Sequence, residues 1–184
     1  MSEVHRLEHD WYPRPLPSNV VMGSRSWCYS AFAFLHYQSR RPCGVRIGHN
    51  TGIYNGTFFD LGPDGEVTIG DYCTLVGAII ATNGPVVIGD YSFLAHEVTL
   101  ADHIAATPAT LNRPAHAKAS KPIILGSNCW IGARAILLGG ANIGEGAIIG
   151  AAAVVNDVIP PYTIAVGNPA RVIKKVKRMP LTED

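Results

Sequence analysis

The chain has 184 residues, and its formal net charge is +1. This length fits one domain with a sizeable core, and the near-neutral charge gives no whole-chain argument for nucleic acid or a membrane surface as a partner. The first residues are polar and charged, so no secretory signal is expected, and the apolar segment 27–37 is too short to span a bilayer. We expect a cytoplasmic protein without a membrane span.

Residues 1–43 lack any repeat. Pro13, Pro15 and Pro17 favour an extended arm over a helix in this segment. We therefore expect residues 1–43 to form an N-terminal arm that caps the repetitive part of the chain.

A six-residue repeat dominates residues 44–170. Its most regular stretch places a large aliphatic residue at Leu125, Ile131, Leu137, Ile143, Ile149 and Val155. A small residue stands two positions before most of these. Because residues two apart share one face of a strand, both members of the pair point inward, and three short sides make one coil. The repeat predicts an all-β fold, a β-helix whose coils stack their aliphatic residues in columns.

The repeat fails between Leu100 and Leu125. Residues 102–122 contain no hexad and several prolines, which predicts an extruded loop. Long loops in repeat proteins are usually functional. Beyond the repeat, residues 171–184 begin with a basic stretch that carries apolar positions, and we expect a short C-terminal basic helix and tail there.

The cysteines indicate packing, not metal binding. Cys73 and Cys129 occupy the small-residue position of a hexad, where a thiol acts as a small hydrophobic group. No Cys-x-x-Cys pair occurs, so neither a metal site nor a disulfide framework is expected, and a reduced cytoplasmic setting is the default.

Three segments carry a resemblance to a known family. They are Ile-Leu-Gly-Ser-Asn-Cys-Trp-Ile-Gly-Ala at 124–133, Ile-Gly-Glu-Gly-Ala-Ile-Ile-Gly-Ala at 143–151, and Gly-Asn-Pro-Ala-Arg-Val-Ile-Lys at 167–174. The chain resembles the hexapeptide-repeat acyltransferases over roughly residues 45–175, and its ending is similar to that of the galactoside, maltose and exopolysaccharide-sugar acetyltransferases. The resemblance implies a left-handed parallel β-helix and a homotrimer. It also implies acetyl-CoA as co-substrate, bound between subunits without a metal.

His103 is the leading catalytic candidate. It stands where the repeat gives way to the loop, which is where the family places its catalytic histidine. An imidazole with a pKa near 6.5 suits removal of a proton from a hydroxyl that attacks a thioester. Side-by-side binding of both substrates then supplies proximity without a covalent enzyme intermediate.

Two other histidines compete with His103. His116 lies within the predicted loop, and His96 follows a Leu-Ala pair in a predicted strand. Either histidine also fits a surface or subunit-contact role. Asp102 and Glu97 are candidates for orienting the catalytic imidazole.

For the cofactor, the resemblance points to six residues. They are Ala95, Trp130, Ala133, Ala151, Arg171 and Lys174. Small side chains at corners would let a pantetheine arm lie along the backbone, and the two basic residues match positions near the adenosine phosphates. One departure concerns Asn156-Asp157, which stands where galactoside-type relatives carry a Thr-Lys pair, and a carboxylate has the wrong charge for a phosphate contact.

The sequence gives less information about the acceptor site than about the cofactor site. Asn83 is the candidate substrate-binding residue, and Tyr54, Asn55 and the turn around Asp60 also lie before His103. Turn formation is the simpler explanation for Asn83.

Four functions remain open. The first is O-acetyl transfer from acetyl-CoA to a sugar or sugar-containing acceptor, and the second is acetylation of an antibiotic. The third is a γ-class carbonic anhydrase, whose three zinc-binding histidines fit poorly to the spacing of His96, His103 and His116. The fourth is a β-helix scaffold without catalytic activity.

Overall fold

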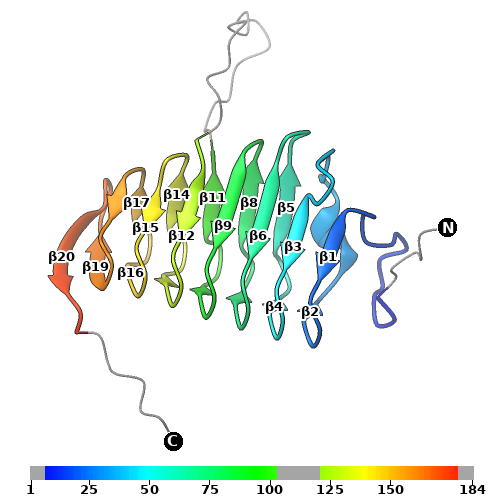
Figure 1. The fold of residues 1–184 in the computed structure, drawn as a ribbon, viewed down its shortest axis with the longest axis horizontal. Helices are drawn as coiled ribbons and strands as arrows, with labels where there is room; N and C mark the ends of the chain where they lie inside the picture. The colour runs from blue at the N-terminus through cyan, green and yellow to red at the C-terminus, as the bar shows by residue number, and fades with distance from the viewer. Residues whose placement is uncertain (1–6, 103–120, 178–184) are drawn as a thin grey trace, which may run out of the picture.

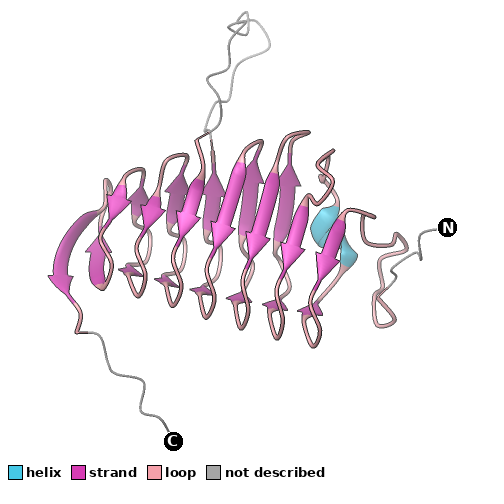
Figure 2. Ribbon diagram, in the orientation of Figure 1, coloured by secondary structure: helices cyan, strands magenta, loops and turns pink. Residues whose placement is uncertain are grey.

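The computed structural model of this protein describes residues 7–102 and 121–177. Short strands stack in a row that runs from the N-terminus to the C-terminus (Figure 1), and the described chain is almost entirely strand and turn (Figure 2). The strands form three sheets, which we call A, B and C.

Neighbouring strands within each sheet are parallel, with one exception at the C-terminal end. Sheet A contains β1 (Val20–Met22), β3 (Val45–Ile47), β6 (Glu66–Ile69), β9 (Pro85–Ile88), β12 (Ile123–Leu125), β15 (Asn142–Ile143) and β18 (Val158–Ile159). Sheet B contains β2 (Trp27–Cys28), β4 (Gly52–Ile53), β7 (Thr74–Leu75), β10 (Phe93–Leu94), β13 (Trp130–Ile131), β16 (Ile148–Ile149), β19 (Thr163–Val166) and β20 (Arg171–Lys175). Sheet C contains β5 (Phe58–Leu61), β8 (Ile79–Thr82), β11 (Thr99–Ala101), β14 (Ile136–Leu138) and β17 (Val154–Val155).

The chain visits sheets A, B and C in turn, and each circuit is one coil. Coil 1 contains β1, β2 and the 3-10 helix η1 (Ala31–Phe34), which takes the place of a strand beside β5. Coils 2 to 6 each contribute one strand to every sheet, and coil 7 contains β18 and β19. The circuit defines three corners, A–B, B–C and C–A. The predicted left-handed parallel β-helix is confirmed.

The core consists of the residues that the hexads place inward. Leu125 and the aliphatic residues that follow it every sixth position, up to Val155, are buried. The residue two positions before each is buried as well, and it is small in every case except Ile123. Cys73 and Cys129 are 1% exposed, so their predicted packing role is confirmed, and all four cysteines are free thiols. Outward positions on the same strands alternate with these, as the two-residue strand period requires.

The β-helix begins earlier than the hexads indicate. Residues 1–43 were expected to form an arm, but β1, β2 and η1 already make the first coil inside this range. The apolar segment 27–37 becomes β2, a corner and η1, and no helix of the described residues is long and apolar enough to cross a membrane. The part before Val20 packs on this coil through Leu16, which is buried.

The C-terminal segment is a strand, so the predicted helix is wrong for residues 171–175. β20 pairs antiparallel with β19 and forms the outer edge of sheet B. The last parallel strand of a solenoid offers unpaired N–H and C=O groups, and a returning strand satisfies them. The β-branched residues Val172 and Ile173 also suit a strand better than an isolated helix.

Carboxylates join successive coils at the A–B corner. The Oδ1 atom of Asp71 accepts a hydrogen bond from the backbone N–H of His49 at 2.7 Å, and Oδ1 of Asp90 accepts one from the N–H of Asp71 at 2.8 Å. The adjacent rings of Tyr72 and Tyr91 stack with centroids 4.9 Å apart. These bonds fix the register between coils on the edge that is opposite sheet C.

Candidate functional site

Backbone hydrogen bonds align one column of residues at the B–C corner. The column consists of Tyr29, Tyr54, Val76, Ala95, Gly132, Gly150 and Val166, and each N–H up to Gly150 bonds to the carbonyl of the next coil at 2.8–3.0 Å. Ala95 therefore shares its position with Gly132 and Gly150, one residue before the position of Ala133 and Ala151. The three alanines predicted to contact the cofactor lie at one corner, but they do not form a single row.

Ala133 and Ala151 follow the column by one residue and share their position with His96. The N–H of Arg134 bonds to the carbonyl of His96 at 2.9 Å, and the N–H of Ala152 bonds to that of Ala133 at 2.9 Å. Ala151 is exposed, and Ala133 is half-buried. The corner thus presents methyl groups and backbone to solvent over two successive coils.

The backbones of neighbouring coils lie very close together at this corner. A Cβ atom built on Gly132 would lie 2.6 Å from the backbone nitrogen of Ala151 and 2.8 Å from the carbonyl oxygen of Ile149. Only glycine fits there, so the two coils pack backbone against backbone at this corner. On the outside of the corner, Ala133 and Ala151 add only methyl groups, and a thin, extended ligand can lie against coils 5 and 6 there.

Trp130 and Lys174 lie in one row on the outer face of sheet B. Strand register pairs Trp130 with Ile148, Ile148 with Ile164, and Ile164 with Lys174. Three strand spacings separate the two ends of the row, about 14 Å. Trp130 is 57% exposed, and its ring meets the ring of Phe93 edge-on at 6.5 Å between centroids. An exposed aromatic face and a cation thus stand beside the B–C corner.

Arg171 extends the corner toward the C-terminal end. It pairs with Val166 across the β19–β20 hairpin, and its Nη1 atom donates to the carbonyl of Ala170 at 2.8 Å. It also lines a cavity of about 260 Å³ together with Asn156 and Asp157. The Oδ1 atom of Asp157 accepts a hydrogen bond from the N–H of Val158 at 2.8 Å.

Asp102 and Asn83 lie at the C–A corner, at the other edge of sheet C. The Oδ2 atom of Asp102 accepts from Thr82 Oγ1 at 2.9 Å and from the backbone N–H of Asn83 at 2.6 Å. The side-chain oxygen of Asn83 accepts from the N–H of Asp64 at 2.9 Å, so Asn83 has the turn-forming role that its residue type favours. Asp102 is the first residue of the predicted loop 102–122, and its side chain is tied to coil 3.

Neither His103 nor His116 falls within the described residues, and neither does most of the predicted loop 102–122. The remaining catalytic candidate, His96, was expected in a strand. It lies instead in an exposed turn between β10 and β11. Across residues 7–102 and 121–177, no three side chains of His, Cys, Asp or Glu converge on a metal position.

Glu97 interacts with an arginine. Its Oε2 atom accepts from Nε of Arg134 at 2.6 Å. That hydrogen bond, and then the charge of Arg134, lower the pKa of the Glu97 carboxyl from its ordinary value. Glu97 stands at the B–C corner, whereas Asp102 stands at the C–A corner. The two carboxylates that the sequence offered for orienting an imidazole therefore lie at different corners of the chain.

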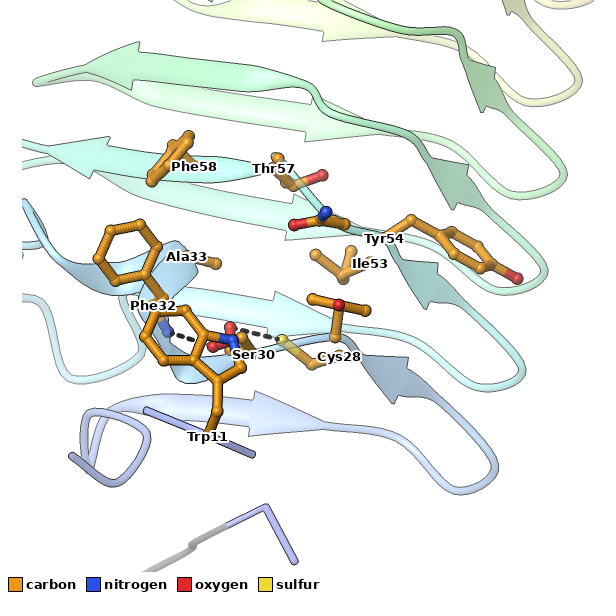
Figure 3. A pocket seen from close by; sticks show the side chains of 12 residues that line it. Trp11, Cys28, Ser30, Phe32, Ala33, Ile53, Tyr54, Thr57 and Phe58 are labelled. Atoms are coloured by element: carbon orange, nitrogen blue, oxygen red, sulfur yellow. Dashed lines mark hydrogen bonds between the residues drawn. The ribbon is translucent and has the colours of Figure 1, made fainter. Parts of the chain in front are cut away.

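A recess of about 160 Å³ opens at the B–C corner of coils 1 and 2 (Figure 3). It includes Tyr54 and Asn55, which the sequence placed near an acceptor, and it adds Trp11, Phe32 and Phe58. Sequence reasoning did not assign these three aromatics to a site. The alternating aromatic residues of Ala31–Phe34 were the available signal.

The family model described as "bacterial transferase hexapeptide (six repeats)" matches residues 122–157. Over 55 residues the chain is 51% identical to a protein of Staphylococcus aureus (strain COL) that is provisionally named an acetyltransferase, but the match spans only 30% of this chain and 28% of that protein. Galactoside O-acetyltransferase of Escherichia coli (strain K12) is 29% identical over 137 residues, which cover 71% of this chain and 63% of that enzyme.

Solved structures share the fold. A hexapeptide-repeat acetyltransferase from Vibrio cholerae, solved with acetyl coenzyme A, superposes with a TM-score of 0.61 and 23% identity, over 80% of this chain and 77% of that chain. A mutant of AntD, an N-acyltransferase from Bacillus cereus solved with a dTDP-sugar and coenzyme A, gives 0.65 and 24%, over 86% and 84%. At these identities the likeness establishes the fold and nothing finer.

Proposed function

Because this chain carries the transferase hexapeptide repeat and has the fold of the hexapeptide-repeat acetyltransferases, we propose that it is an acetyl-CoA-dependent O-acetyltransferase that works as a homotrimer on a sugar hydroxyl. The observation that carries this proposal is the B–C corner, where the six candidate cofactor residues gather on one corner and the sheet face beside it.

The corner suits the donor in shape and in charge. Its bare backbone between Ala133 and Ala151 fits the narrow pantetheine arm, and Lys174 and Arg171 lie toward the C-terminal end, where they would meet phosphates. Trp130 offers an exposed aromatic face beside this path. Acetyl-CoA, when bound, supplies an acyl group activated as a thioester.

The acceptor hydroxyl must lose a proton as it attacks. His103 is the base that takes this proton, and Asp102, the residue before it, holds the start of the loop against Thr82 and Asn83. The side chain of Asn83 is exposed at the same corner and is close enough to Asp102 to help seat the acceptor.

The two halves of this site lie on different edges of one chain. From Glu97 at the B–C corner to Asp102 at the C–A corner, the backbone crosses the width of sheet C, about 16 Å. A loop from one copy placed against the B–C corner of the next copy removes this separation, and cyclic repetition of that contact closes a ring. Two similar proteins support sugars as the acceptor class. Galactoside O-acetyltransferase is named for a sugar, and AntD was solved with a dTDP-sugar.

The decisive experiment measures thiol release from acetyl-CoA against a panel of sugars, nucleotide sugars and antibiotics. His103→Ala should reduce kcat by about a hundredfold or more, as removal of a general base commonly does, without loss of trimer in sedimentation. His116→Ala is the matched control and should retain activity. Full activity of His103→Ala would refute the assignment, and absence of saturable acetyl-CoA binding in calorimetry would favour a scaffold.

A further inference from the structure

The recess at coils 1 and 2 has a clear chemical character. Twelve residues line it, and none of them carries a formal charge. Trp11, Phe32 and Phe58 form an aromatic wall on one side, and Tyr54 stands at the opposite rim (Figure 3). The Trp11 and Phe32 centroids are 5.4 Å apart, and those of Phe32 and Phe58 are 5.7 Å apart. The recess therefore favours a neutral, flat or apolar-faced group over an anion.

The volume matches a single ring. A cavity of about 150 Å³ in an engineered protein takes up benzene, and this recess measures about 160 Å³. Trp11 is 66% exposed and Tyr54 is 46% exposed, so the two rings form a rim that a visiting group would cover. The side-chain amide of Asn55 adds a hydrogen-bonding group that can fix orientation.

Hydrogen bonds to Asp10 hold the backbone on both sides of Trp11 and the start of η1 in place. The carboxylate of Asp10 accepts hydrogen bonds from the N–H of Ala31 at 2.5 Å, from Ser30 Oγ at 2.7 Å and from the N–H of Tyr12 at 2.9 Å. Trp11 lies between two of these anchored positions. A wall that is already ordered loses little entropy when a ligand stacks on it.

The recess lies on the same corner as the candidate cofactor path. Tyr54 and Ala95 belong to one hydrogen-bonded column and are separated by two coil steps, about 10 Å. From this placement we infer that the recess is an acceptor subsite, which binds an uncharged ring of the acceptor remote from the hydroxyl that is acetylated. The inference rests on the proposed function, and it selects neutral glycosides with a second ring over nucleotide sugars.

The probes are phenyl β-glucoside, methyl β-glucoside and UDP-glucose. Calorimetry on the full-length protein, with coenzyme A present, should show saturable binding of the phenyl glucoside. The methyl glucoside should bind about tenfold more weakly, because it lacks the ring that stacks. UDP-glucose should bind no better than the methyl glucoside, since the recess has no cation for a phosphate.

Trp11→Ala should weaken binding of the phenyl glucoside by about tenfold and leave the methyl glucoside unchanged. Trp27→Ala is the matched control: Trp27 is also exposed in coil 1, but it stacks on His9 and does not line the recess. In the acetylation assay, Trp11→Ala should raise KM for the phenyl glucoside while kcat and the KM for acetyl-CoA stay constant.

Equal binding of the phenyl and methyl glucosides, or no effect of Trp11→Ala, overturns the subsite. Absence of saturable binding by every probe overturns it as well. Ring-dependent binding without acetyl transfer to any sugar of the panel would refute the proposed function, and the recess would then be a ring-binding site without an acceptor role. Acetyl transfer with the same KM for the phenyl glucoside in Trp11→Ala as in the unchanged protein would refute the subsite and leave the proposed function intact.

Discussion

Replacement of Asp102 by alanine should separate the structural role of this residue from the catalytic role that we propose for the loop. The Oδ2 atom of Asp102 accepts two hydrogen bonds, from Thr82 Oγ1 and from the N–H of Asn83. Asn83 is exposed and can bond to water after the change, whereas Thr82 is 3% exposed and keeps only its bonds within the corner. A bond to a charged group contributes about 1.5–3 kcal/mol, and partial rehydration returns some of it.

We therefore expect Asp102→Ala to lower the free energy of unfolding by about 1–2 kcal/mol. At about 2–4 °C per kcal/mol for a chain of this size, the melting temperature should fall by roughly 2–8 °C. The effect on catalysis should be larger, because displacement of a catalytic group by about 1 Å can cost a hundredfold. Calorimetric melting and the kcat of thiol release measure the two effects on the same preparation.

Asp90→Ala is the matched control for this experiment. Asp90 also accepts a backbone hydrogen bond from the preceding coil, at 2.8 Å, but it does so at the A–B corner, away from the loop. It should lose comparable stability and keep its kcat. Asp102→Asn retains an acceptor oxygen and should recover part of the activity. If Asp102→Ala loses stability like Asp90→Ala but keeps full kcat, the anchor has no part in catalysis.

Three other predictions address the cofactor path, the thiols and the N-terminal arm. Lys174→Ala should raise the KM for acetyl-CoA several-fold. Lys175→Ala should not, because Lys175 pairs with Thr163, whose side chain faces inward, and so lies outside the row of Trp130. Equal effects in the two variants would argue against a phosphate contact. Burial raises the pKa of the Cys129 thiol to about 11, so at pH 8 its thiolate fraction is roughly two hundredfold below that of an ordinary cysteine; mass spectrometry after iodoacetamide treatment should find it unlabelled until guanidinium unfolds the chain. Burial tends to raise the pKa of Asp10, but hydrogen bonds from Ala31, Tyr12 and Ser30 outweigh it and lower the pKa below 3.8. The Asp10 carboxylate helps to hold the arm, here the segment before Val20, on the first coil. This stabilisation is therefore present above that value and is lost as the pH falls through the lowered pKa. Limited proteolysis should detect release of the arm in acid, and Asp10→Asn should remove the pH dependence.

The hexads were sufficient to predict the β-helix because each one encodes a buried pair by residue size alone. Cys129 and Ile131 are buried as the repeat requires, without help from any distant segment. The first coil was missed because its third side is η1, a 3-10 helix, and its sequence carries no hexad. Its strands are identified by pairing with β3 and β4, and no local signal in the sequence reports such pairing.

The C-terminal strand shows a different limit. Basic residues with interspersed apolar ones are compatible with a helix or a strand, and the free edge of β19 decides between them. Sequence motifs picked out Ala95, Ala133 and Ala151, which lie at one corner, but they gave Ala95 the same place in its hexad as the other two alanines. Only the hydrogen bonds from coil to coil reveal that Ala95 is equivalent to Gly132.

The parallel register of the coils has a consequence for how acceptor length can change. The recess lies at coils 1 and 2, the loop leaves coil 4, and every coil advances the chain by one strand spacing of about 4.8 Å. Lengthening a surface loop does not alter that interval, because paired strands on all three sides maintain it. Only gain or loss of a whole coil does, so the distance from the proposed ring-binding recess to the start of the loop changes in steps of one strand spacing. In such a scaffold, acceptor size would evolve in steps, while the chemistry of each end could drift independently.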